Sequence, residues 1–519
     1  MTRLTYLLIL VLFFFGEAPL RAVELNILFT SDQHGWLSSK LYSPKLKGYG
    51  LLHLEKEILR WKKKDKELLL LDGGDSMQGS PLVHYAHRFT PKQNPFLEKL
   101  EELGYDAIAL GNHDLEENPY FERYDRRPNF WLAANAYRLG KNAFQPYRIL
   151  QRKGLKIAIL GLTTTGSHLW LPPTRLQGLQ IKDLVTEGQR WVKLLKEKER
   201  PDLIILLLHS GLNPTRDDRA SKLMSLPPAN QSHHLLKELQ GVTLALTGHD
   251  HRRNPYRPGP LTYVGSTAVA AGESRGKGLM HIRLELKQNQ GSWQLQSARA
   301  EHIPPSQDPQ ILKTYQDLLP AGYEPWLNQG LPFQVISKDK EQLALCLNQS
   351  LANSIDQEGL DGSLLPIIEI KRNAKGRQIT RRMLQDWIRY DNDWELVELT
   401  LRQIHLLWAR SPQKQKKQRY NQRLYASWKN PPPTAQAGLW WPSINDFRET
   451  RRVALSSYHA QGGGGLAGKI LLDQNQRQGT IGRGLRKRFF TFLAAAPSLP
   501  KVCLGVVRPI DPGRTKLRE

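Results

Sequence analysis

The chain has 519 residues, and 40% of them are hydrophobic, which supports packed cores and excludes a chain that is disordered throughout. Domains usually span about 100–200 residues, so two or three domains are expected. Lysine and arginine number 74 against 49 aspartate and glutamate, and this net charge of +25 favours anionic partners such as nucleotides, nucleic acid, acidic lipid or polyanionic polymers.

The N-terminus has the pattern of an export signal. Arg3 precedes an unbroken apolar run at 7–15, which is shorter than the roughly 20 residues that a membrane-spanning helix needs. We therefore expect residues 1–22 to be a cleaved signal peptide, with an uncleaved anchor as the alternative. The mature protein would be exported, periplasmic or secreted, and would have no transmembrane segment.

The next 280 residues alternate between short apolar runs and amphipathic stretches. The apolar runs are rich in Leu, Ile and Val, as in strands buried on both faces; they lie at 25–29, 68–71, 107–110, 157–160, 203–208 and 242–246. The stretches 51–61 and 184–199 have helical spacing. This alternation predicts an α/β domain over 23–302, ending after a strand at 281–285.

A proline-rich stretch at 303–305 marks the expected boundary to a second domain. Residues 303–331 are predicted to form a helical linker, with its helix at 308–319, and residues 332–519 a smaller domain with a loop at 430–433. The basic runs at 414–423 and 483–488 are interpreted as solvated faces, so no specific nucleic-acid partner is expected. Cys346 and Cys503 could form one disulfide in an oxidising compartment, and the sequence leaves this open.

Five of the apolar runs end in side chains that commonly bind metals. The polar segments are 30–34 (TSDQH), 72–75 (DGGD), 111–114 (GNHD), 209–211 (HSG) and 247–251 (TGHDH). Functional sites of open α/β sheets lie at the carboxyl ends of the strands. In an extended Asp-x-His segment, alternate side chains share one face, so Asp32 and His34 could reach the same cation. Each motif alone is more often structural, but the series predicts a site for divalent Zn, Mn, Co or Mg.

The order Asp-x-His, Gly-Asp, Gly-Asn-His-Asp, His-Ser-Gly, Gly-His-x-His resembles the calcineurin-like metallophosphoesterase superfamily over roughly residues 25–266. The resemblance implies a four-layer αββα sandwich that holds two divalent metal ions. It implies that Asp75 bridges the two ions. One ion would be bound by Asp32, His34, Asp75 and His251, and the other by Asp75, Asn112, His209 and His249.

The same resemblance implies a mechanism and catalytic residues. A hydroxide held between the two ions would attack phosphorus in line with the leaving alkoxide. His113 would stabilise the transition state or protonate the leaving group, with Glu116 orienting its imidazole. Asn112 would also contact the substrate. The neighbouring Asp114 is interpreted as a structural acceptor in a turn.

The C-terminal part is similar to the C-terminal domain of 5'-nucleotidases at 376–380 (GRQIT), 387–392 and 395–400. Residues 454–468 resemble a segment of the 2',3'-cyclic nucleotide 2'-phosphodiesterase branch. That likeness implies a substrate-specificity domain in which Tyr458 stacks on the base and Gly463 and Gly464 contact the substrate. A packing role for Tyr458 is the alternative.

The C-terminal part also departs from the family pattern. Where the family has Gly-Gly-x-Arg, residues 367–372 read IIEIKR, so Lys371 or Arg372 would have to substitute for the arginine. A second base-stacking aromatic could be Trp440, Trp441 or Phe447.

We therefore expect an exported metal-dependent phosphoesterase acting on nucleotide phosphate esters, of the 5'-nucleotidase or 2',3'-cyclic nucleotide phosphodiesterase type. The alternatives are a thiosulfohydrolase-like or other non-nucleotide hydrolase of the same superfamily, and a non-catalytic anion-binding relative. The sequence does not set the oligomeric state.

Overall fold

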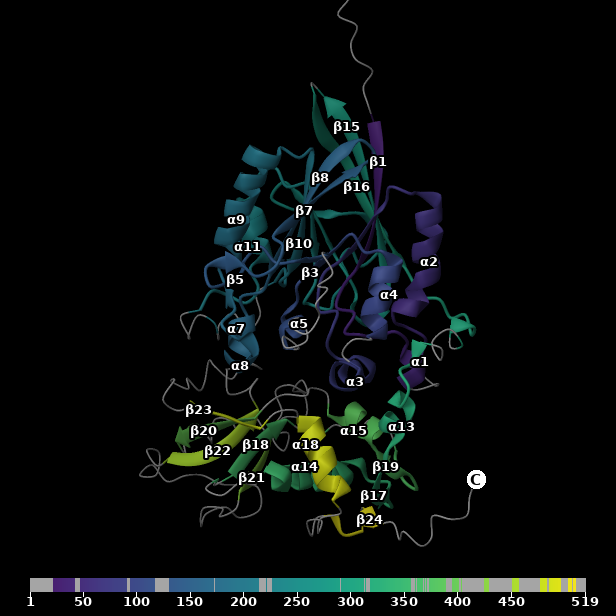
Figure 1. Cartoon of the computed structure of the whole chain (residues 1–519), viewed down its shortest axis with the longest axis vertical. Helices are drawn as coiled ribbons and strands as arrows, with labels where there is room; N and C mark the ends of the chain where they lie inside the picture. Colours follow the sequence, from purple (N-terminus) through teal and green to yellow (C-terminus); the bar gives the residue numbers. More distant parts are fainter. Residues whose placement is uncertain are drawn as a thin grey trace, which may run out of the picture.

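The computed structural model describes the chain from residue 22 to residue 509 with internal gaps. The residues that it does not describe within these limits are 43–46, 91–93, 117–129, 172, 214–220, 222–225, 290, 312, 314–317, 356–359, 361, 367, 369, 371–372, 389–393, 401–402, 404–423, 429–449, 457–476, 483–484, 496–502, 506. Figure 1 shows a larger N-terminal domain built on two sheets and a smaller C-terminal domain beside it. None of the described helices is long and apolar enough to cross a membrane.

The first sheet of the N-terminal domain has seven strands. Their order is β12 (Gly259–Pro260), β16 (Ser292–Ile303), β15 (Leu279–Asn289), β1 (Ala22–Thr30), β2 (Leu69–Asp72), β3 (Ala107–Ala109) and β4 (Trp131–Leu132). Strands β1 to β4 run parallel, whereas β15 lies antiparallel to β1 and forms a hairpin with β16. The strand expected at 281–285 is thus the middle part of the longer antiparallel strand β15.

The second sheet has six strands in the order β13 (Thr262–Val264), β14 (Thr267–Ala271), β11 (Leu244–Thr247), β10 (Leu203–His209), β8 (Leu155–Thr163) and β7 (Tyr147–Arg152). Its four central strands are parallel. A further small sheet joins β6 (Lys141–Asn142), β5 (Ala136–Arg138) and β9 (Gln180–Ile181). Each of the six apolar runs of this domain forms a strand, whose ends differ from the expected ones by a few residues.

The two large sheets pack face to face and are covered by helices on their outer sides. Alternate residues of β1, such as Leu25, Ile27 and Phe29, are fully buried in the apolar layer between the sheets. Leu28 points the other way, into a second apolar layer beneath α2 (Leu51–Lys64) and α4 (Pro95–Leu103). On the second sheet, α9 (Leu184–Leu194), which continues as a π-helix (Leu195–Glu199), and α11 (Ser232–Glu238) cover the outer face. The predicted four-layer αββα sandwich is confirmed.

Both predicted helices of this domain are present. The helix expected at 51–61 continues to residue 64, and the one expected at 184–199 includes the π-helical last turn. Short elements fill the loops: α1 (Ser39–Tyr42), α3 (Pro81–Phe89), α5 (Asn112–Glu116), α7 (Ser167–Trp170), α8 (Pro173–Leu176) and a 3₁₀ turn (Ser274–Gly276). In the linker, residues 311, 313 and 318 are helical, and the rest of the predicted helix either is not helical or lies outside the described residues.

The described C-terminal domain combines two small sheets with three helices. One sheet has the order β19 (Gln378–Thr380), β17 (Gly330–Val335), β24 (Val507–Pro509). The other has the order β21 (Leu424–Trp428), β18 (Gly362–Pro366), β22 (Thr450–Ser456), β20 (Trp394–Thr400), β23 (Arg477–Gly482). The helices are α14 (Lys340–Ile355), α15 (Arg381–Trp387) and α18 (Leu485–Ala494). Their apolar cluster includes Cys346 and Cys503, which are joined by a disulfide.

Helix α13 (Tyr323–Asn328) joins the two domains. Its Trp326 ring lies 5.3 Å from the ring of Tyr85 on α3 of the N-terminal domain. On the other side, the guanidinium of Arg381 on α15 lies 4.8 Å from the Trp326 ring and 3.5 Å from that of Phe490 on α18. A salt bridge of 3.0 Å between Arg382 and Glu324 fastens α15 to α13.

Candidate dinuclear metal centre

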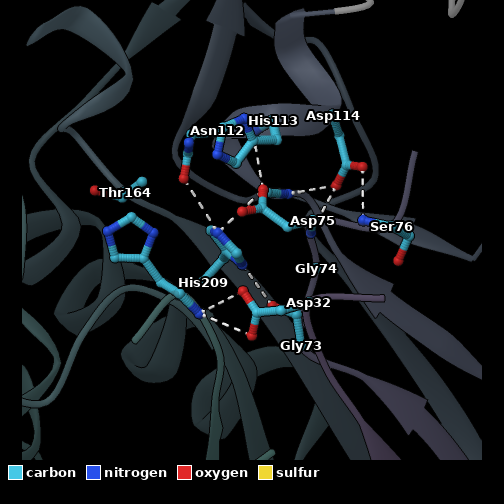
Figure 2. A network of polar contacts seen from close by, with 12 residues as sticks. Asp32, Gly73, Gly74, Asp75, Ser76, Asn112, His113, Asp114, Thr164 and His209 are labelled. Carbon is cyan, nitrogen blue, oxygen red and sulfur yellow. Dashed lines mark hydrogen bonds and ion pairs between the residues drawn. The ribbon is translucent and has the colours of Figure 1, made fainter. Parts of the chain in front are cut away.

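The loops that follow the central parallel strands meet at one edge of the sandwich. Asp32 and His34 follow β1, Asp75 follows β2, and Asn112 follows β3. From the second sheet, His209 ends β10, while His249 and His251 follow β11. Because neighbouring parallel strands end at the same edge, motifs far apart in the sequence lie side by side there, as Figure 2 shows.

Backbone contacts hold these loops in conformations that most residues avoid. The N–H of Asp32 donates to the carbonyl of Gly74, and that of His34 to the carbonyl of Asp75, each at 2.8 Å. Five of the proposed ligands have positive φ angles: Asp32 (51°), His34 (50°), Asp75 (56°), His249 (77°) and His251 (56°). Non-glycine residues rarely adopt such angles, and those that do are found preferentially at functional sites. At Gly111, a Cβ atom would lie 2.2 Å from the nitrogen of Asp75, so only glycine permits this approach.

Two groups of side chains could each hold a metal ion, and Asp75 belongs to both. In the first group, one ligand atom from each of Asp32, His34, Asp75 and His251 lies within 4.8 Å of the others. The Nε2 atoms of His34 and His251 are 3.0 Å apart. His34 donates through Nδ1 to the carbonyl of Gln78, at 2.8 Å, which leaves Nε2 as the nitrogen with a lone pair.

The second group contains Asp75, His209 and His249, again with ligand atoms within 4.8 Å of one another. His209 Nε2 lies 3.2 Å from both Asp75 Oδ1 and Asn112 Oδ1. Its Nδ1 donates to the carbonyl of Gly73 at 2.7 Å, the arrangement that also orients metal-binding histidines. The structure therefore brings all seven predicted ligands together, in the two sets that the sequence resemblance implied.

The protonation of these residues suits metal binding. Burial, with the charge of a neighbouring histidine, lowers the pKa of His34 and of His249 to about 3, so both imidazoles are neutral. Burial would raise the pKa of Asp32, but His251 beside it outweighs this effect and the pKa falls to about 2. Neutral imidazoles and ionised carboxylates are the forms that bind cations.

The charge balance of the second group also fits a cation. Burial opposes ionisation of Asp75, but His209 and His113 hold its pKa well below the usual range. Burial likewise opposes the charged form of His209, yet the adjacent Asp75 carboxylate raises the pKa of His209 to about 9. A proton on His209 thus balances the buried carboxylate, and a divalent ion would take over that role by displacing the proton. The residues present fit two divalent ions.

His113 and Glu116 form a pair beside this cluster, on helix α5. His113 Nδ1 donates to Glu116 Oε1 at 2.7 Å, and the two side chains are 21% and 26% exposed. The backbone N–H of His113 donates to Asp75 Oδ1 at 2.8 Å, and its ring lies 5.3 Å from that of His34. The glutamate is thus long enough to accept the imidazole N–H, as expected.

Asp114 holds the loop that carries Asp75. Its carboxylate is fully buried and accepts hydrogen bonds of 2.7–3.0 Å from the backbone N–H groups of Asp75, Ser76, Met77 and Gly111. Figure 2 shows the Asp114 side chain directed at Ser76 and Asp75. Burial and the charge of Asp75 raise the pKa of Asp114 to about 7. This agrees with the interpretation of Asp114 as a structural acceptor, which here orders a loop of the metal centre.

Two further contacts at the centre had no recognisable signal in the sequence. The ring of Trp170, on α7, stacks on that of His249, and Arg175, on α8, donates to the backbone carbonyl of Glu116. In contrast, Tyr458, Gly463 and Gly464 lie outside the described residues, as do Lys371, Arg372, Trp440, Trp441 and Phe447. Their predicted roles therefore stay predictions.

Comparison with known proteins defines the class of the N-terminal domain. Residues 25–253 match the model of the calcineurin-like phosphoesterase family. The match covers every proposed metal ligand together with His113 and Glu116. The resemblance noted in the sequence is therefore confirmed.

The curated relatives include a 5'-nucleotidase and protein UshA. The chain is 34% identical over 201 residues to a 5'-nucleotidase of Vibrio cholerae. This alignment covers 37% of this chain and 34% of that protein. It is 29% identical over 203 residues to protein UshA of Escherichia coli, again 37% of this chain and 34% of the relative. The alignments thus span about a third of the length of these curated relatives.

Solved structures resemble nearly the whole chain in fold. A 5'-nucleotidase precursor from Thermus thermophilus matches with a TM-score of 0.61 at 17% identity, covering 91% of this chain and 97% of that one. The sulfate thiohydrolase SoxB of the same organism matches with a TM-score of 0.56 at 16% identity, covering 91% and 94%. The two-domain α/β architecture is therefore shared with proteins of different substrates.

Proposed function

We propose that this protein is an exported, metal-dependent phosphoesterase that hydrolyses nucleotide phosphate esters, of the 5'-nucleotidase or 2',3'-cyclic nucleotide phosphodiesterase type. The observation that carries the proposal is the pair of ligand groups sharing Asp75, with the His113–Glu116 pair alongside. The family match of residues 25–253 supports the same reaction class.

In this proposal the ligand side chains hold two divalent ions, the first by Asp32, His34, Asp75 and His251, and the second by Asp75, Asn112, His209 and His249. When bound, such ions would supply a nucleophilic water at neutral pH and neutralise charge on the phosphoryl oxygens. The backbone strain at the ligands is consistent with a centre whose geometry is fixed before substrate binds.

His113 would act on the phosphoryl group or on its leaving oxygen. Because Glu116 accepts the Nδ1 proton, Nε2 is the ring nitrogen that would contact the substrate. In its protonated form the imidazole can donate a proton to the leaving oxygen or stabilise negative charge in the transition state. Asn112, which precedes His113 on α5, would bind a substrate oxygen as well as the second ion.

Export is supported by two independent features. The N-terminal segment has the pattern of a signal peptide, and Cys346 and Cys503 are joined by a disulfide, which persists in oxidising compartments. The preference for nucleotides is supported by the relatives named 5'-nucleotidase and by the C-terminal motifs. Substrate contacts by Tyr458, Gly463 and Gly464 belong to this proposal.

A metal-reconstitution screen tests the proposal. The purified chain is stripped with a chelator, reloaded with Mn, Zn, Co or Mg, and assayed on 5'-nucleotides, 2',3'-cyclic nucleotides, an aryl phosphate and a sulfur ester such as S-sulfocysteine. We expect two metals per chain and the highest kcat/KM on a nucleotide. Preferential turnover of the sulfur ester would favour the thiosulfohydrolase-like alternative. Metal binding without any turnover would favour an anion-binding relative.

A further inference from the structure

A short segment follows strand β8 and lies at the same end of the domain as the metal centre. We call Ser167–Leu176, which contains α7 and α8, the α7–α8 segment. Helix α8 is in contact with α5, and Figure 1 shows the two at the same end of the domain. The family ligand motifs include no residue of this segment.

The α7–α8 segment is anchored in the sandwich. At its start, Ser167 Oγ donates to the carbonyl of Thr164 at 2.9 Å, and Thr164 Oγ1 donates to the carbonyl of Ala229 at 2.6 Å. Leu169 and Leu171 are buried, and the backbone N–H of Ile181 donates to His168 Nε2 at 2.9 Å. Because the segment is held at several points, its side chains have fixed positions and restrict the residues that they contact.

Arg175 connects this segment to the His113–Glu116 pair. Arg175 Nη1 donates to the backbone carbonyl of Glu116 at 2.8 Å. Glu116 is the last residue of the five-residue helix α5, so its carbonyl has no partner within the helix. Since the side chain of Glu116 orients the His113 ring, a bond that fixes the Glu116 backbone also limits the position of that ring.

Trp170 makes the corresponding contact with the metal centre itself. Its ring stacks on the imidazole of His249 with centroids 5.0 Å apart and an interplanar angle of 27°. The indole also packs closely on Gly166, where a Cβ atom would lie 2.4 Å from the ring. This packing restricts the indole, and the indole in turn restricts the plane of the His249 ring.

We propose that the α7–α8 segment positions both parts of the active site: Arg175 fixes the His113–Glu116 pair, and Trp170 fixes the His249 ring for metal binding. Both are positioning residues, because each acts through another side chain. This inference rests on the proposed function, but the role of Trp170 can be tested by measuring metal binding, without turnover.

For Arg175, we expect a loss in kcat with little change in KM. A misplacement of about 1 Å can cost roughly 10²-fold in rate, so Arg175→Ala should lower kcat by about 10- to 100-fold. Metal content should stay at the wild-type level. Arg175→Lys, which retains a donor, should recover part of the loss.

A double-mutant cycle with His113→Ala separates positioning from other roles. If Arg175 acts through His113, adding Arg175→Ala to the His113→Ala variant should produce no further loss. Arg148→Ala is a matched control, because Arg148 also donates to a backbone carbonyl, that of Asp106, just before β3 begins. That variant should keep wild-type kcat. Equal losses from Arg175→Ala in both backgrounds, or a loss confined to KM, would overturn the assignment.

For Trp170, the readout is metal affinity in the chelator-stripped protein, titrated with Zn or Mn alone. Changes beside metal ligands typically cost about 10- to 100-fold in affinity, and we expect Trp170→Ala to weaken one of the two sites by such a factor. Trp170→Phe, which can still stack, should bind nearly as wild type does. If the metal affinity of Trp170→Ala were unchanged, the proposed role of Trp170 would be wrong. If the wild-type protein hydrolysed no phosphate ester, but Trp170→Ala still bound metal more weakly than wild type, the proposed function would be wrong and the positioning role of Trp170 would remain.

Discussion

The two domains place their candidate functional residues in different ways. In the N-terminal domain, all seven proposed ligands lie within a few residues of the end of a buried parallel strand, and sheet pairing brings them together. In the C-terminal domain, the proposed substrate residues Tyr458, Gly463 and Gly464 come after β22, outside the described residues. A centre built at strand ends is fixed by the fold of the N-terminal domain, and none of its proposed ligands comes from the C-terminal domain. Variants in the two domains should therefore have separable effects.

The largest effect is expected for Asp75→Asn. Asp75 belongs to both ligand groups, so loss of its charge should remove both metals and abolish turnover of every phosphate ester. Metal content per chain and aryl phosphate turnover would be measured on the purified variant.

Asp72→Asn is the matched control for this experiment. Asp72 is also buried at the end of β2, but it binds Thr30 and Ser76 and belongs to neither ligand group. Burial raises the pKa of Asp72 to about 7, so the charge of this carboxyl is less needed and we expect the protein to tolerate a neutral amide there. This variant should keep its metals and most of its activity. If Asp75→Asn behaved like Asp72→Asn, the shared-ligand assignment would be wrong.

The difference between the domains also explains what the sequence could predict. The ligand sets were recognisable because Asp32 and His34, like His249 and His251, are two positions apart in the chain and directly follow apolar runs. The sandwich followed from those same runs. Trp170 and Arg175 gave no signal, because their contacts with His249 and Glu116 come from packing between separate loops. Strand β14 (TAVAA) was also missed, since alanine gives only a weak apolar signal.

The next largest effect is expected for His113→Ala, which should lower kcat while both metals stay bound. General acid or base groups typically contribute about 10²–10⁴-fold, and we expect a loss in that range. Glu116→Gln should lose less, because its amide oxygen can still accept the Nδ1 proton. Loss of metal from the His113 variant would show that this histidine is a ligand.

A smaller effect, limited to one substrate class, is expected for Tyr458→Ala. Stacking of a base on an aromatic ring is worth about 1–3 kcal/mol in single-strand binding, which corresponds to roughly 5- to 150-fold in kcat/KM for nucleotides. Aryl phosphate turnover should change little, because remote binding energy does not help that substrate. Tyr458→Phe should behave as wild type does. Equal losses on both substrates would identify Tyr458 as a packing residue.

The smallest effect on turnover is expected from removal of the disulfide. Cys346 on α14 and Cys503 before β24 are both nearly inaccessible to solvent, and the bond closes a chain separation of 157 residues. In the chain-entropy account a loop of that length contributes about 5 kcal/mol, so the double variant Cys346→Ala with Cys503→Ala should unfold its C-terminal domain at lower denaturant concentration. The disulfide joins only C-terminal elements, and therefore metal content and aryl phosphate turnover in buffer should remain at the wild-type level. Intrinsic fluorescence and aryl phosphate turnover would be followed along one urea titration. Aryl phosphate turnover reports the N-terminal domain, whereas tryptophans of both domains contribute to the intrinsic fluorescence. We therefore expect a first fluorescence transition, shifted to lower urea, during which turnover is retained. If both signals shifted to the same lower midpoint, the contacts of α13 with α3 and α15 would couple the domains into one cooperative unit, and the separation of the two regions would fail.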